Sequence, residues 1–302
     1  MHELIRSNKR RSALLVLGFV IVVVLVGAAF GWVLGGGSAV ATVIALVIAG
    51  AIAFGSYWKA DKIALAVSRA HPADEREHAR LHNIVEGLCI ASGLPKPGVY
   101  IVDDPAPNAF ATGRNPQHAS IAVTTGLLET MNRVELEGVV AHELSHIRNY
   151  DVLVSTLAVT MVGAVALLAD LAIRSMWWNG GRVPRGGDHG NRNNPLALVG
   201  FALLIIAPLI ARAMQAAISR QRESLADVSA CEMTRYPPGL ISALEKLQAD
   251  QTATHSASTA TAHMWIEQPM SGLGDRGKLS GPHGWFNTHP PLEERIALLR
   301  EL

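Results

Sequence analysis

The sequence predicts a mainly α-helical membrane protein, in which four transmembrane helices carry a mostly helical polar unit with a small β-sheet. The composition favours this class: of 302 residues, 49% are hydrophobic and 17% are charged, against about 25% charged in an average soluble protein. The mean hydropathy is +0.25, and only 5% of the residues are aromatic, so the excess is aliphatic. This composition excludes intrinsic disorder, and a net charge of +1 gives no overall attraction to nucleic acid.

The aliphatic residues are concentrated in four runs that hold at most one charge each. The first two runs contain 21 uncharged residues each, enough for a helix to cross a hydrocarbon core of about 30 Å. The third contains 22 residues with one acid, Asp170, and the fourth contains 16 residues before Arg212. Because an arginine can extend its charge to the interface, we expect the fourth helix to continue toward Ile218. The runs are Leu14–Leu34, Ser38–Trp58, Val152–Ile173 and Leu196–Ala211.

Basic residues near these runs indicate how the chain crosses the membrane. Four lie in the N-terminal tail and three closely follow the second run, whereas the turn between the first two runs has none. Since cytoplasmic segments carry the excess of Lys and Arg, we expect both termini and both polar regions on the cytoplasmic side. Four arginines in the loop 174–195 oppose this orientation. The expected division is a basic tail 1–13, a membrane hairpin 14–58, a polar region 59–151, a membrane hairpin 152–218 and a polar region 219–302.

Apolar spacing predicts the elements of the polar regions. Apolar residues three and four apart indicate helices, and strict alternation indicates strands. Pro237 and Pro238 are expected to end one of the helices. The expected helices are Pro72–Ser92, Arg133–Asn149, Ala213–Tyr236, Leu240–Ala249 and Leu292–Leu302; the expected strands are Val99–Asp103 and Ile121–Thr124; flexible loops are expected over Thr252–His263 and Ser271–Gly284.

One of these helices contains the sequence His-Glu-Leu-Ser-His, which places His142 and His146 four residues apart. Residues four apart share one face of a helix, so both imidazoles can bind a single cation. Zinc suits two imidazoles plus a carboxylate and keeps one position for water. Glu143 flanks that position, and a carboxylate there can take the proton of an attacking water. The pattern is typical of a zinc-dependent peptide hydrolase.

A third metal ligand is expected in the second polar region, on the same side of the membrane. Glu223 and Asp227 lie four residues apart in the helix expected over Ala213–Tyr236. One of these carboxylates can bind the metal while the other accepts a hydrogen bond from a ligating histidine and orients it. Arginines flank both acids, so a salt-bridged surface is the alternative interpretation.

Four ordered motifs together resemble the HtpX-type membrane zinc metalloproteases, relatives of the CAAX prenyl endopeptidases. The His-Glu-Leu-Ser-His motif at 142–146 precedes the segment 219–227, which reads S-R-x-R-E-x-x-A-D. The segment 108–113 is similar to the family's N-A-F-A-T-G, and the segment 288–296 to its T-H-P-P-x-x-x-R-I. The motifs span nearly the whole chain, so the resemblance implies a zincin-like catalytic domain attached to the four membrane helices.

The resemblance also implies roles for the residues around the metal. His142, His146 and Glu223 would bind one zinc ion per chain. Glu143 would act as the general base. Asp227 would orient a zinc-binding histidine.

Further roles follow from the other two motifs. His289 and Arg295 would stabilise the negative charge that develops on the carbonyl oxygen, as cationic donors do. The insertion 252–284 is longer than the resemblance predicts, and we expect it to lie away from the zinc motifs. The backbone of a substrate would pair with an edge segment made by Asn108, Ala109, Phe110 and Ala111.

The implied function is that of a zinc endopeptidase that degrades damaged or misfolded membrane proteins. Such a quality-control and stress-response enzyme would be a multi-pass protein of a bacterial inner membrane, with its active site on the cytoplasmic side. One alternative is an inactive scaffold of the same fold, although the intact Glu143 argues against it. A transporter is the other alternative, but Asp170 is the one ionisable residue in the three longer runs, and transport pathways need such residues.

Overall fold

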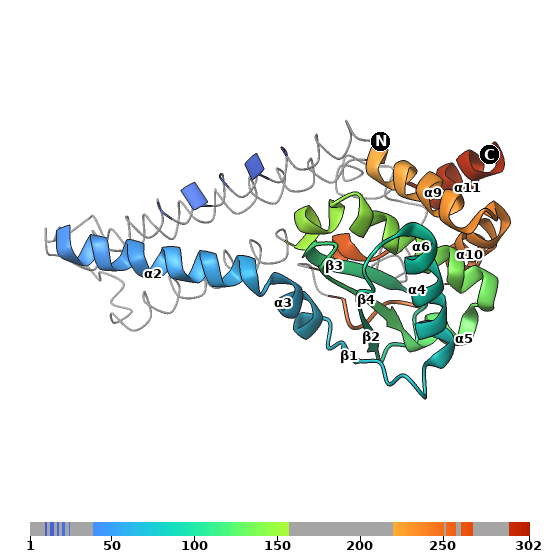
Figure 1. The fold of residues 1–302 in the computed structure, drawn as a ribbon, viewed down its shortest axis with the longest axis horizontal. Helices are drawn as coiled ribbons and strands as arrows, with labels where there is room; N and C mark the ends of the chain where they lie inside the picture. Colours follow the sequence, from blue (N-terminus) through green and yellow to red (C-terminus); the bar gives the residue numbers. More distant parts are fainter. Residues whose placement is uncertain are drawn as a thin grey trace, which may run out of the picture.

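A computed structural model of the chain describes residues 10, 13, 14, 17, 20, 21, 24, 39–156, 220–250, 252–257, 261–267 and 290–302. In this part of the chain a four-stranded sheet lies among helices, and one long helix extends away from that body (Figure 1). The predicted combination of mostly helical structure with a small sheet is therefore confirmed. The runs predicted at Leu14–Leu34, Val152–Ile173 and Leu196–Ala211 lie mostly or wholly outside the described residues.

The long helix is α2 (Ala39–Trp58), which coincides with the second predicted run. The shorter α3 (Ala60–Val67) follows it and contacts the sheet. Large apolar side chains along α2 are exposed, among them Val47 and Phe54 at 67% each. Within the described ranges, no helix combines the length and the hydropathy that a membrane crossing requires.

The sheet is mixed and has the strand order β1-β2-β4-β3. The two central strands, β2 and β4, are parallel, while β1 and β3 pair antiparallel with them, so β3 forms one edge. The two strands predicted from alternation correspond to β2 and β4, and the edge segment expected from Asn108 onward leads into β3. The strands are β1 (His71–Pro72), β2 (Gly98–Val102), β3 (Ala109–Asn115) and β4 (His118–Thr124).

Seven further helices lie in the described part of the chain. The helix expected to begin at Pro72 begins later, because Pro72 pairs with Tyr100 in the sheet. The helices predicted at Arg133–Asn149, Leu240–Ala249 and Leu292–Leu302 are confirmed within three residues at each end. The helix predicted at Ala213–Tyr236 is confirmed from Arg220 to Thr234, and its predicted start lies outside the described residues. The bounds are α4 (Ala79–Ser92), α5 (Thr125–Thr130), α6 (Arg133–Arg148), α9 (Arg220–Thr234), α10 (Pro237–Ala249), the 3-10 helix η1 (Ala262–Met264) and α11 (Leu292–Arg300).

The proline pair lies where it was expected, since α9 ends at Thr234, before Pro237. The next helix begins at Pro237 and not at the predicted Leu240, because a proline in the first helical turn lacks only an N–H that the helix would leave unbonded. Within the loop predicted over Thr252–His263, the described residues 252–257 form no helix or strand, whereas the 3-10 helix η1 begins at Ala262.

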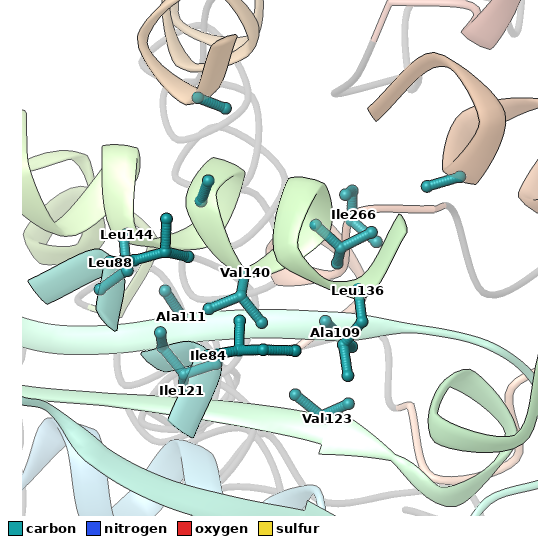
Figure 2. Close-up of a cluster of buried hydrophobic side chains, with 14 of the residues drawn as sticks. Ile84, Leu88, Ala109, Ala111, Ile121, Val123, Leu136, Val140, Leu144 and Ile266 are labelled. Carbon is teal, nitrogen blue, oxygen red and sulfur yellow. The ribbon is translucent and has the colours of Figure 1, made fainter. Parts of the chain in front are cut away.

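Side chains of the edge strand alternate between two hydrophobic clusters on opposite faces of the sheet. Ala109 and Ala111 belong to the larger cluster, together with Leu136 and Val140 of α6 (Figure 2). Phe110, which lies between them in sequence, belongs to a smaller cluster on the other face with residues of α3. The edge strand is therefore fixed from both faces, and α6 lies directly against it.

Helix α6 begins with a complete capping box. The Asn132 side chain accepts hydrogen bonds from the N–H groups of Val134 and Glu135, at 2.9 and 3.0 Å, and Glu135 accepts from the Asn132 N–H at 2.8 Å. Ser242 and Lys246 of α10 each donate to Glu135 at 2.7 Å. These contacts fix the start of the motif-bearing helix and join it to α10.

Glu135→Gln is expected to lower the free energy of unfolding by about 1–2 kcal/mol near neutral pH, since it weakens the cap and removes a charge facing Lys246. Burial acts to raise the pKa of Glu135, but Lys246, the Asn132 N–H and the Ser242 hydroxyl outweigh it and lower the pKa below its ordinary value. A carboxylate with a lowered pKa stabilises the fold above about pH 4.3 and loses that contribution as the pH falls further. Chemical unfolding should therefore show that the free energies of unfolding of wild type and Glu135→Gln differ less at pH 3.5 than at pH 7. An equal difference at both pH values would contradict the assignment of a lowered pKa to Glu135.

Candidate metal centre

Helices α6 and α9 bring the three predicted metal-binding side chains together. His142 and His146 lie one turn apart on α6, and Glu223 lies in the first turn of α9. The Nε2 atoms of the two histidines are 3.2 Å apart. The carboxylate oxygens of Glu223 lie 3.5 Å from Nε2 of His142 and 3.6 Å from Nε2 of His146.

These separations fit a zinc ion. Ligand atoms about 2.1 Å from a tetrahedral centre lie about 3.4 Å from one another. The three separations bracket that value, with Oε2 of Glu223 nearer His142 and Oε1 nearer His146. Two imidazoles and one carboxylate form a donor set that catalytic zinc uses, with the fourth position left for water. His146 is the one partly exposed member of the group, so the centre borders solvent on its side.

The buried ion pair between Asp227 and Arg295 contacts the His142 ring at Nδ1, the ring nitrogen that does not face the metal centre. Nδ1 of His142 lies 2.9 Å from Oδ1 of Asp227, which leaves the Nε2 lone pair directed at the centre. Arg295 of α11 donates to both oxygens of Asp227, from Nε at 2.9 Å and from Nη2 at 2.7 Å. Burial acts to raise the pKa of Asp227, but Arg295 and His142 outweigh it and lower the pKa to about 2. Asp227 is therefore ionised at neutral pH.

The ring of His146 has a corresponding carboxylate, Asp151, which the sequence reasoning missed. Nδ1 of His146 lies 3.4 Å from Oδ2 of Asp151, and Nη1 of Arg222 lies 3.7 Å from the other oxygen. Burial acts to lower the pKa of His146, but Glu223 and Asp151 outweigh it and raise the pKa to about 9. A charged residue directly before a long apolar run was the available signal in the sequence.

Glu143 is buried on α6 beside the metal-binding histidines, where it is 2% exposed. Burial raises the pKa of its carboxyl group above the ordinary range, and the neighbouring Glu223 adds to the rise. The charges of His142, His146 and Arg295 act in the opposite direction. A carboxyl group in this setting is closer to the neutral pH at which a general base works best.

Comparison with known proteins assigns the family. The sequence pattern of peptidase family M48 matches residues 75–302, which include every motif described above. The chain belongs to peptidase family M48. It is a zinc metallopeptidase with the His142–His146–Glu223 site characteristic of that family.

Full-length relatives agree with the M48 assignment. The chain is 45% identical over 304 aligned positions to a protease HtpX homolog of Caldanaerobacter subterraneus subsp. tengcongensis, covering 100% of this chain and 98% of the relative. It is 41% identical to a protease HtpX homolog of Streptococcus uberis, with 100% of both chains covered. The crystal structure of S. mikatae Ste24p has a similar fold, with a TM-score of 0.50 and 17% identity over 99% of this chain and 67% of that one.

The remaining predicted site residues of the M48 peptidase that the structure describes are all buried. Arg295 is 1% exposed, so it is not a surface charge. The four residues of the edge segment, Asn108–Ala111, are all buried at the edge of the sheet. His289 lies outside the described residues.

One residue of the insertion 252–284 is connected to the metal centre through Arg295. The carbonyl oxygen of Ile266 accepts a hydrogen bond from Nη1 of Arg295 at 3.3 Å, and Arg295 also holds Asp227. The insertion therefore contacts the metal centre through one guanidinium group. The sequence could not indicate this contact, because the residues around Ile266 have no periodic pattern.

Proposed function

We propose that this M48 peptidase is a membrane-embedded endopeptidase that hydrolyses polypeptides, with damaged or misfolded membrane proteins as its substrates. The convergence of His142, His146 and Glu223 beside the buried Glu143 is the observation that carries the proposal. A zinc ion bound there would lower the pKa of a water ligand to about 7 and polarise the scissile carbonyl.

Glu143 is the general base of the proposed reaction. It takes a proton from the attacking water and later gives that proton to the leaving amine. The raised pKa of Glu143 favours the first transfer, because a carboxylate with a higher pKa accepts a proton more readily.

Arg295 and two carboxylates have supporting roles. Asp227 and Asp151 are positioning residues, each holding one zinc-binding ring by its Nδ1 atom. Two of the Arg295 nitrogens are bonded to Asp227, and the third, Nη1, donates to the carbonyl oxygen of Ile266. We assign to Nη1, together with His289, the stabilisation of the developing oxyanion.

A substrate would bind along the edge strand β3. Main-chain hydrogen bonds to an exposed strand edge give affinity without selecting a particular sequence, which suits an enzyme that degrades varied unfolded segments. The edge segment Asn108–Ala111 leads directly past α6, which carries the zinc-binding histidines and Glu143.

The proposed setting is a bacterial inner membrane crossed by four helices, with the active site on the cytoplasmic side. The four apolar runs and the basic residues beside the first two support this topology. The exposed apolar side chains of α2 also favour a non-aqueous surrounding. At the end of α2, the Arg114 guanidinium lies 4.2 Å from the ring centre of Trp58 and donates to its carbonyl oxygen at 3.0 Å. An interfacial tryptophan is thereby joined to β3.

Measurement of bound zinc and casein cleavage in detergent tests the proposal, with Glu223→Ala beside the wild type. The wild type is expected to hold one zinc ion and to cleave casein, whereas Glu223→Ala loses both because one of three protein ligands is gone. Glu232→Ala is the matched control, since Glu232 lies exposed on the same helix, and it should retain both. Full zinc occupancy in Glu223→Ala would remove Glu223 from the ligand set.

A further inference from the structure

Residues 261–267, named here the latch segment, begin with the 3-10 helix η1 and lie against the start of β3 through Ile266 and Glu267. The N–H of Ile266 donates to the carbonyl oxygen of Ala109 at 2.9 Å. The next residue, Glu267, forms two hydrogen bonds with the Asn108 side chain, one from its N–H at 3.2 Å and one to its carbonyl oxygen at 2.9 Å. As the latch segment advances by one residue, its partner in the edge segment moves back by one, so the two chains are antiparallel.

The side chains of the latch segment continue the same register. Trp265 stacks edge-on against Phe110 with ring centroids 4.7 Å apart, on the face of the sheet opposite α6. Ile266 points to the other face and joins the cluster around Leu136 and Ala109 (Figure 2). Both side chains are almost completely buried. This alternation is that of an added strand.

The latch segment also reaches the metal centre. The carbonyl oxygen of Ile266 accepts from Nη1 of Arg295 at 3.3 Å. Ile266 thus donates its N–H to the edge strand and offers its carbonyl to the guanidinium, which are the two contacts that a substrate residue is proposed to make.

We propose that the latch segment occupies the substrate edge in the resting enzyme, and that a peptide binds by displacing it. This inference rests on the proposed function for the identity of the substrate edge. A peptide strand would restore the hydrogen bonds that the latch segment gives up, so the exchange of backbone bonds is nearly neutral. The free energy gained by burying the side chains of Trp265 and Ile266 then determines how strongly the latch segment stays bound to the edge of β3.

The geometry also indicates which backbone groups of β3 face a peptide. Asn108 directs its carbonyl toward β4, where Thr124 donates to it, so Ala109, Ala111 and Gly113 face outward by strand alternation. Ala109 is bonded to Ile266, and the N–H of Gly113 donates to the Thr156 hydroxyl at 2.9 Å. Among the described residues no hydrogen bond is made by the outward groups of Ala111, and we propose that a displacing peptide pairs with Ala111 as well as with Ala109.

Hydrogen exchange on the zinc-loaded, full-length Glu143→Gln enzyme in detergent measures the displacement directly. The probe is a tripeptide hydroxamate, which binds zinc and extends as a strand. With the probe bound, amides of the latch segment should exchange faster while amides of β3 remain protected. Unchanged or slower exchange of the latch segment would mean that it is a fixed wall of the cleft, and would overturn the proposal.

Two substitutions at one position give a second test. Ile266→Pro removes the N–H that bonds Ala109, and Trp265 already has the extended conformation, with φ −76° and ψ 140°, that a residue before proline adopts. Ile266→Ala is the matched control, because it shortens the side chain but keeps the N–H. Losing one backbone hydrogen bond should raise the open population, and with it kcat/KM for a short peptide, about fivefold over Ile266→Ala.

The possible failures of this test are distinguishable. If Ile266→Pro and Ile266→Ala have equal thermal midpoints and equal kcat/KM, the latch proposal is wrong while proteolysis stands. If the zinc-loaded wild type cleaves no peptide at all, the proposed function fails, and the exchange measurement still decides whether the latch segment moves.

Discussion

Glu143→Gln is expected to lower kcat/KM for casein-derived peptides by about 10³-fold, a loss typical of removing a general base, while bound zinc stays at one ion per chain. Glutamine has nearly the same shape as glutamate, so the buried position on α6 is filled without a cavity. An amide cannot accept the proton of an attacking water at neutral pH. The three metal-binding residues are unchanged, so the metal content separates loss of the base from loss of the site.

Glu129→Gln is the control for this experiment, since Glu129 lies exposed on α5 and its amide variant should keep full activity. The peptide assay is combined with zinc analysis on the same detergent-purified samples. Normal cleavage by Glu143→Gln would disprove the assigned mechanism, because no other described carboxylate beside the zinc ligands is free of a positioning contact: Asp227 holds His142 and Asp151 holds His146.

The two zinc-binding histidines are predictable from the sequence because their spacing fixes their relative position on a helix. Two histidines four apart on a helix must share a face, and α6 places them so. The capping box at Asn132 and Glu135 likewise depends on local contacts. Glu223, by contrast, is distinguished from Asp227 only by the family resemblance, since either acid has suitable chemistry and spacing.

Contacts between distant segments were not predictable in the same way. Asp151 reaches His146 because the chain turns sharply after α6, at Tyr150, which has a φ of 62°. Ile266 reaches Arg295 because an insertion without periodicity packs against β3. Trp265 and Ile266 lie between the two predicted loops, and the burial of Trp265 depends on Phe110, a tertiary contact that no local pattern records.

Asp227→Asn is expected to lower the free energy of unfolding by about 3–5 kcal/mol, because it leaves the buried Arg295 guanidinium without a counter-ion. Zinc affinity should also fall about 10–100-fold, since His142 loses the carboxylate that orients its ring. Chemical unfolding and competition with a chelator measure the two effects on the same protein.

The pH dependence follows from the ionisation of Asp227. Its pKa of about 2 in the folded protein lies below the ordinary value of about 3.9. A group with a lowered pKa contributes its full stability above the ordinary value and loses it as the pH falls through the folded one. The difference between wild type and Asp227→Asn should therefore be constant from pH 5 to pH 8 and should shrink as the pH falls from about 4 toward 2.

The double variant Asp227→Asn with Arg295→Met separates the two effects. Removing the unpaired charge should recover much of the lost stability, because an apolar side chain of similar length can fill the buried space. Zinc affinity should stay low, since the His142 ring still lacks its carboxylate partner. If the double variant is no more stable than Asp227→Asn alone, the Arg295 charge is not what the carboxylate compensates. Recovery of zinc affinity would instead mean that Asp227 acts on the metal centre only by neutralising Arg295.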